Sequence, residues 1–178
     1  MIKTKKIIAT LGVVAGLGMA AAPLAANALA GVDAVVTVTV GSQLSLTIDS
    51  ATVNIPMDVN DVDTSVSSKL TVSTNTAGYN ITVKDVNGDG SLVHTVTNSF
   101  KIAPITDGTA PQAGDGKWGL KVGDNWYGVS NTAKNIKNAS AGAVTNEVTN
   151  VTYGVGTAAS QAAGDYTATI HYEVTAAN

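Results

Sequence analysis

Oxygen-bearing side chains alternate over residues 85–90 in the order that opens a calcium-binding loop. Asp85, Asn87 and Asp89 supply the oxygens, and the glycine that follows permits the sharp turn that such a loop needs. The twelfth position of the motif would carry a bidentate Glu, but this chain has Val96 there. Because the segment must also form the hairpin turn between the predicted strands Tyr79–Val83 and Leu92–Val96, we favour a plain turn and keep Ca²⁺ as the alternative.

Few residues could support catalysis. The chain has two histidines, His94 and His171, and no cysteine. His171 and Glu173 point the same way on a predicted strand and could share a metal ion, but a metal site normally needs three or four ligands. The sequence also has no serine-hydrolase or zinc-protease motif. We therefore predict that the protein is not an enzyme and has no cofactor, and a secreted hydrolase is the least favoured alternative.

The two tryptophans fall in one predicted hairpin, whose turn is Gly123–Asn125. Trp118 alternates with apolar residues, so we expect it in the core. Trp126 would then point outward, where a flat ring can stack on a sugar. Large aromatic residues more often pack within the fold, so both roles, sugar stacking and packing, stay open for Trp126.

Apolar and polar residues alternate along much of the chain after residue 35, which is the pattern of strands with one buried face. Short runs of this kind, separated by turn signals, predict an all-β fold, an antiparallel β-sandwich of the immunoglobulin-like type. The apolar positions are Val36, Val38 and Val40; Leu44, Leu46 and Ile48; Leu70 and Val72; Tyr79, Ile81 and Val83; Trp118, Leu120 and Val122; and Tyr166, Ala168, Ile170, Tyr172 and Val174.

Two stretches lack a clear period. Residues 104–116 are rich in Gly, Pro and Asp and predict a loop. Residues 130–150 are rich in Asn, Ala and Thr, and a short helix near Thr132–Asn138 is an open alternative there. No internal repeat divides the chain, so we expect a single domain over residues 31–178.

The first thirty residues read as a secretory signal. Lys3, Lys5 and Lys6 precede an apolar run, and the small-residue sites Ala26–Ala28 and Ala28–Ala30 follow it. This order predicts a helical signal peptide over residues 1–30 that is removed on export, although the run is nearly long enough for a retained membrane anchor. The mature protein is then extracellular.

The charge of the mature chain limits its partners. Removing the three N-terminal lysines from ten basic residues leaves seven against 13 acidic residues, a formal charge of −6. A negative surface without Arg repels nucleic acid and anionic lipid, so we expect neither partner, and no membrane contact after cleavage.

The closing segment, Gly164–Val174, resembles the last strand of WxL domains, with its alternating Tyr166, Ala168 and Ile170. These domains are β-sandwiches on the surface of Gram-positive bacteria that attach non-covalently to peptidoglycan. Where that family carries Trp-x-Leu, this chain has Tyr79-x-Ile81 and Tyr172-x-Val174. The resemblance implies a cell-wall location and makes Tyr79 and Tyr172, with Trp126, the candidate ligand-binding residues.

Two functions follow as predictions. The first is a secreted cell-surface adhesion module that binds peptidoglycan or another surface glycan or protein without covalent attachment. The second is a structural subunit of a surface fibre or layer. Residues 35–40 alternate as Val-Val-Thr-Val-Thr-Val directly after the signal peptide, and such a strand can complete the sheet of a neighbour by self-association. An ordinary first strand explains the same residues.

Overall fold

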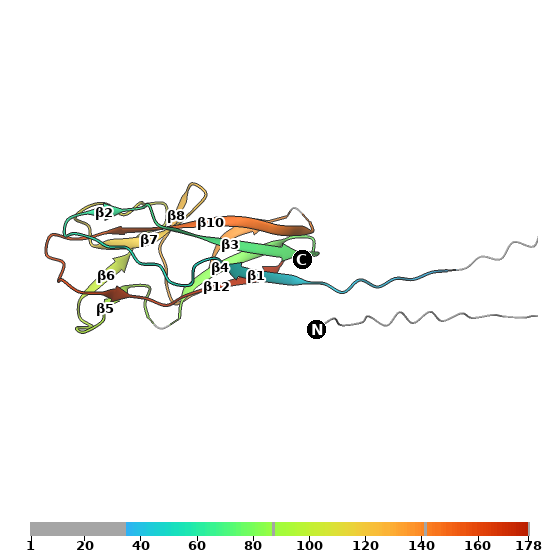
Figure 1. Ribbon diagram of the computed structural model, residues 1–178, viewed down its shortest axis with the longest axis horizontal. Helices are drawn as coiled ribbons and strands as arrows, with labels where there is room; N and C mark the ends of the chain where they lie inside the picture. Colours follow the sequence, from blue (N-terminus) through green and yellow to red (C-terminus); the bar gives the residue numbers. More distant parts are fainter. Residues whose placement is uncertain (1–34, 87, 141, 178) are drawn as a thin grey trace, which may run out of the picture. The chain divides into compact units, whose positions relative to one another are not determined.

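Every regular element in residues 35–86, 88–140 and 142–177, which the computed structural model describes, is a β-strand (Figure 1). The predicted all-β class is therefore confirmed. The predicted signal peptide, residues 1–30, lies outside the described residues. Within the described residues there is also no helix long and apolar enough to cross a membrane.

The strands belong to two sheets. The three-stranded sheet has the order β12-β4-β9, and its strands are β4 (Tyr79–Asp85), β9 (Lys134–Ala139) and β12 (Ile170–Ala176). The nine-stranded sheet has the order β1-β3-β10-β7-β6-β5-β11, with β2 paired to β10 and β8 to β7. Its strands are β1 (Leu44–Ile48), β2 (Val62–Asp63), β3 (Ser67–Thr74), β5 (Leu92–His94), β6 (Lys101–Pro104), β7 (Lys117–Val122), β8 (Asn125–Tyr127), β10 (Val144–Gly156) and β11 (Tyr166–Thr167).

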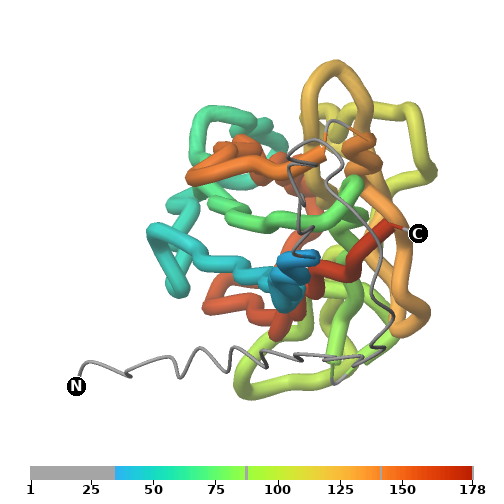
Figure 2. Tube along the Cα trace, turned by 90° about the vertical axis from the view of Figure 1, so that its right-hand side faces the viewer, coloured from blue at the N-terminus to red at the C-terminus, as the bar shows by residue number. Residues whose placement is uncertain are grey.

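The larger sheet is mixed and curls into half a barrel (Figure 2). All its strand pairs are antiparallel except β6 and β7, which run parallel through Ala103↔Lys117 and Pro104↔Trp118. The loop was predicted at residues 104–116; Pro104 belongs to β6, and residues 105–116 make this crossover without a helix. The purely antiparallel arrangement that we predicted is thus wrong at this pair.

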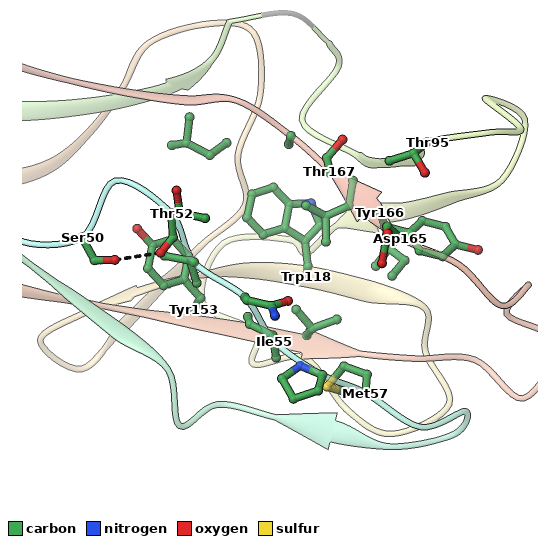
Figure 3. A pocket seen from close by; sticks show the side chains of 18 of the residues that line it. Ser50, Thr52, Ile55, Met57, Thr95, Trp118, Tyr153, Asp165, Tyr166 and Thr167 are labelled. Atoms are coloured by element: carbon green, nitrogen blue, oxygen red, sulfur yellow. Dashed lines mark hydrogen bonds between the residues drawn. The ribbon is translucent and has the colours of Figure 1, made fainter.

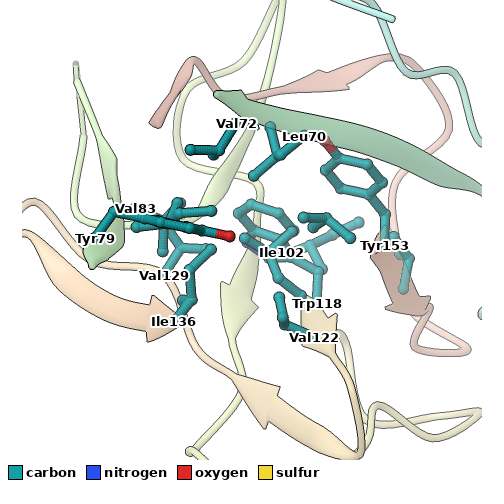
Figure 4. Close-up of a cluster of buried hydrophobic side chains, with 14 residues drawn as sticks. Leu70, Val72, Tyr79, Val83, Ile102, Trp118, Val122, Val129, Ile136 and Tyr153 are labelled. Carbon is teal, nitrogen blue, oxygen red and sulfur yellow. The ribbon is translucent and has the colours of Figure 1, made fainter. Parts of the chain in front are cut away.

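The core is built from both sheets. Leu70 and Val72 of β3 face Tyr79 and Val83 of β4, and Trp118 of β7 lies below them (Figure 4). All five side chains are at most 3% exposed. Alternation explains this, since β-branched and aromatic residues occupy every second position of these strands and so share one face.

Three predicted elements differ in the structure. The predicted strand at residues 35–40 has no strand assignment. The helix considered near Thr132–Asn138 is wrong, because Lys134–Ala139 forms β9 at the edge of the small sheet. The segments around residues 79–83 and 92–96 are not a hairpin, because β4 pairs with β9 and β12 whereas β5 pairs with β6 and β11.

The predicted last strand is divided. Tyr166 and Thr167 form β11 and pair with β5 in the large sheet, whereas Ile170–Ala176 forms β12 and pairs with β4 in the small one. Between them the Thr169 carbonyl accepts a hydrogen bond from the Val86 amide. One alternating segment therefore serves both sheets.

The chain contains two compact units, Met1–Thr39 and Val40–Asn178. All the strands belong to the second unit. Of the first unit the structure describes only residues 35–39, which are exposed.

Candidate functional site

An open groove with a volume of about 1560 Å³ lies in the strand-bearing unit (Figure 3). One rim is the segment of residues 50–59, which follows β1, and the other is formed by residues 161–172. Core side chains make the floor, among them Leu70, Trp118 and Tyr153. Such a hollow exceeds the usual ~300–1,000 Å³ of a small-molecule pocket, so it has room for a larger occupant.

Trp118 fixes the floor of the groove. Its side chain is 3% exposed, and its indole Nε1 donates a hydrogen bond of 2.7 Å to the Gly90 carbonyl. The only polar atom of the ring is thus satisfied inside the fold, as buried Trp residues require. The indole therefore supports the groove from beneath and has no hydrogen bond to offer an occupant.

Residues 52–58, which form one rim, alternate between half-buried and exposed side chains as a strand does, but they pair with no strand in the described part of the chain. Val53, Ile55 and Met57 are half-buried and pack against the core, whereas the residues between them are exposed. Among the described residues, none donates or accepts a hydrogen bond at the backbone of residues 53–57. An extended segment of this kind presents its N–H and C=O groups to any strand that lies beside it.

Tyr153 and Tyr172 meet at the groove wall. Their hydroxyl oxygens are 3.2 Å apart, and burial raises the pKa of Tyr172 far above its ordinary value, with Tyr153 adding to the effect. The Tyr172 phenol therefore stays protonated near neutral pH. Tyr172 lines the groove, as a ligand-binding residue would, but its polar atom faces another tyrosine.

His94 has a structural role. Its Nε2 lies 3.0 Å from the Ala163 carbonyl, and Nδ1 accepts hydrogen bonds from the amides of Val96 and Thr97. These partners require the tautomer that is protonated at Nε2. The imidazole therefore holds two loops together and has no free nitrogen for proton transfer.

The calcium candidates are occupied by other contacts. Asp85 Oδ2 accepts from the Gly90 amide at 3.0 Å, and Asp89 bonds the Ser91 amide and the Lys101 ammonium. Asn87 lies outside the described residues. No group of three or more metal-ligating side chains occurs in the described part of the chain. These contacts match the turn that we favoured, which connects the two sheets.

Tyr79 is the candidate ligand-binding residue that the structure corrects. Its side chain is 0% exposed, so it cannot contact a glycan in this fold. The ring faces the core because it shares its strand face with Ile81 and Val83. Burial raises the pKa of its hydroxyl, and the Lys137 ammonium lies 5.5 Å from the ring centre.

Trp126 lies on the other side of the large sheet, against β10. A Cβ atom added to Gly154 would meet the Trp126 ring at 2.5 Å and Pro111 at 2.8 Å, so the ring lies directly on the glycine backbone. The side chain is half-buried. The geometry favours the packing role that the sequence left open, and it does not bring Trp126 to Tyr172.

Glu147 and Lys137 form a partly buried ion pair at 2.6 Å, with side chains 32% and 21% exposed. The Lys137 hydrogen bond holds the pKa of Glu147 below its ordinary value of 4.5. A carboxylate with a lowered pKa stabilises the fold above its unfolded pKa and loses this effect as pH falls. We expect Glu147→Gln to lower the free energy of unfolding by about 1 kcal/mol or less at pH 7.

The pH dependence distinguishes this pair from simple packing. Urea unfolding between pH 7 and pH 3 should show the difference between wild type and Glu147→Gln shrinking below about pH 4.5. Glu173, an exposed strand residue, supplies the matched control Glu173→Gln. A constant difference across this range would mean that the charge of Glu147 does not contribute.

Sequence reasoning missed the groove and its unpaired rim. The signal was present as Val53-Asn54-Ile55-Pro56-Met57, which alternates like a strand but carries a proline. Pro inside such a run indicates an edge strand or an unpaired segment, so the unpaired rim could have been predicted. The depth of the groove could not, because it depends on packing between distant segments.

Comparison of the chain with protein-family models, and with curated proteins, gives no match. The resemblance to WxL domains therefore stays a prediction from the residues of the last strand.

Proposed function

We propose that this protein is an extracellular structural subunit of a bacterial surface fibre or layer, joined to its neighbours by β-strand addition. The observation that carries the proposal is the exposure of residues 35–40. Val35, Val36, Val38 and Val40 are 93%, 84%, 78% and 78% exposed, and none lies in a strand. Four exposed valines in six residues form an apolar surface of the kind that marks interaction sites.

The pattern of this segment fits a strand that has no partner within its own chain. Val36, Val38 and Val40 would share one face of an extended strand, with Thr37 and Thr39 on the other. β-branched residues favour this extended backbone. The main-chain groups could pair with an exposed sheet edge, and the valines would supply the apolar contact.

Other features support the extracellular setting. The predicted signal peptide would direct export, and the chain has no thiol that an oxidising environment could convert to a disulfide. We also propose that the two sheets, which share one core, form a β-sandwich of the WxL-like kind. That architecture is common among cell-surface modules.

The alternative of a glycan-binding wall module loses its candidate surface. Tyr79 is buried, Tyr172 bonds Tyr153, and Trp126 packs on Gly154 across the large sheet. Sugar recognition by aromatic stacking needs exposed rings on one face. The three residues offer no such common surface, so the exposed valines support assembly better than these aromatics support glycan binding.

The test compares residues 31–178 of wild type with Val38→Asp. A carboxylate at Val38 would have to be buried between strands, so we expect association at least about tenfold weaker. Sedimentation velocity over a range of concentrations gives the association, and electron microscopy shows whether the products are ordered. Val96→Asp is the matched control, because Val96 is 85% exposed and lies outside the segment.

The proposal fails if the wild-type protein stays monomeric at every concentration, or if Val38→Asp associates as well as wild type. Sedimentation with isolated peptidoglycan, in parallel, tests the wall-binding alternative. Protein that pellets only with peptidoglycan, and equally in both valine variants, would favour that alternative.

A further inference from the structure

We infer that the groove beside residues 52–58 is the acceptor for residues 35–40 of a second copy of this chain. This inference rests on the proposed function and specifies its partner surface. The donor strand would lie along the unpaired rim, with three valines against the half-buried apolar side chains that line the groove, among them Leu46, Ile55 and Ile170.

The rim has the hydrogen-bonding groups that an added strand needs. In an extended segment the N–H and C=O of alternate residues point to the same side, so Val53, Ile55 and Met57 form one row. Pro56, which has no N–H, lies in the other row and leaves this one complete. Since no hydrogen bond reaches the backbone of residues 53–57 in the described part of the chain, the whole row is available.

The size and charge of the donor suit the groove. Six extended residues span about 20 Å, comparable with the seven-residue rim at residues 52–58. Residues 34–48 contain no charged side chain. Two copies that each carry a formal charge of −6 repel each other, so their contact requires a neutral segment at its centre. The Val/Thr strand satisfies that requirement.

Residues 41–43 lie beside Asn75, at the end of β3. The Asn75 side chain bonds both neighbours of Ser42, accepting from the Gln43 amide at 2.6 Å and donating to the Gly41 carbonyl at 2.9 Å. The Asn75 amide also donates to the Gln43 carbonyl at 3.3 Å. These bonds continue the β1–β3 pairing, so residues 41–43 already have partners and are not the turn of a hairpin with β1. A second copy is therefore the occupant that we propose.

Disulfide trapping tests the inference directly, since the natural chain has no Cys. Thr37→Cys places a thiol at the middle of the donor, and Asn54→Cys places one on the exposed face of the rim. We expect the double variant of residues 31–178 to form a ladder of covalent oligomers under mild oxidation. A bound donor holds the thiols at roughly millimolar effective concentration, so at about 10 µM protein the yield should be on the order of 100-fold above control.

Two further double variants make the result specific. Thr37→Cys with Asn125→Cys replaces another exposed Asn at the β7–β8 turn, and Thr37→Cys with Ser45→Cys probes the free edge of β1. Covalent oligomers that form only in the Thr37→Cys, Asn54→Cys variant support the inference. Equal ladders in all three variants, or a closed monomer linked between its own residues 37 and 54, would overturn it.

The test also separates this inference from the proposed function. A ladder with Ser45→Cys alone would place the added strand at β1, so the groove would be excluded while assembly by strand addition stands. If no variant forms a ladder and the wild-type protein remains monomeric, both the groove and the proposed function are excluded.

Discussion

Replacing Trp118 with Ala is expected to lower the free energy of unfolding by about 3–5 kcal/mol. The indole is 3% exposed at the floor of the groove, where it packs with core residues of the large sheet. Truncation removes its buried apolar surface and also leaves the Gly90 carbonyl without the Nε1 hydrogen bond. Urea unfolding followed by circular dichroism measures the change.

Two variants serve as controls for this prediction. Trp118→Phe keeps most of the packing and loses the hydrogen bond, so its loss should be smaller than that of the Ala variant. Trp126→Ala removes the other Trp, which is half-buried on the opposite side of the sheet, and should also cost less. Equal losses for Trp118→Ala and Trp126→Ala would contradict the central position that we assign to Trp118.

Several strands with regular alternation could be predicted from the sequence, and the structure confirms those that contain residues 44–48, 70–72, 79–83 and 118–122. Leu70, Ile81 and Leu120 are each 0% exposed, as the period-two pattern requires. The bend at residues 88–90 could also be predicted, because Asp and Gly favour such a backbone. In these places the local preference of the residues agrees with their burial in the fold, so the sequence pattern predicts the structure correctly.

Pairing between distant segments could not be predicted. Val83 and Leu92 lie close in sequence and both alternate, yet their strands belong to different sheets. The β9 strand was missed because Lys134, Asn135 and Asn138 disfavour strands in isolation, and its pairing with β4 outweighs that preference.

In the candidate site, too, the local feature could be predicted from the sequence and the contact between distant segments could not. Residues 35–40 were identified from their alternation, because this feature is local. The acceptor depends on Trp118, Tyr153 and residues 52–58 meeting across more than half of the chain, and no local pattern encodes that meeting. Tyr79 became a binding candidate only through the resemblance to WxL domains, whereas its alternation with Ile81 and Val83 already predicted the buried position that the structure shows.

Gly90→Ala is expected to lower the free energy of unfolding by about 2–5 kcal/mol, combining backbone strain with a steric clash. Gly90 has φ +92°, a conformation that side chains other than glycine rarely adopt. An added Cβ would lie 2.0 Å from the Val129 carbonyl oxygen. Neither side can easily move apart, because Gly90 also bonds Asp85 and Trp118. Urea unfolding of the variant measures the loss.

Gly108→Ala separates the two contributions. Gly108 has φ +81°, but an added Cβ there would have no atom within 4 Å, so its variant should show the strain alone, about 1–2 kcal/mol. The excess loss in Gly90→Ala then measures the contact between the turn at residues 85–90 and Val129. Because that turn joins the two sheets and accepts the Trp118 hydrogen bond, the same variant should also disturb the floor of the groove. Near-equal losses in the two glycine variants would mean that the turn can shift away from Val129, and the floor would then lack the rigid support that we assign to it.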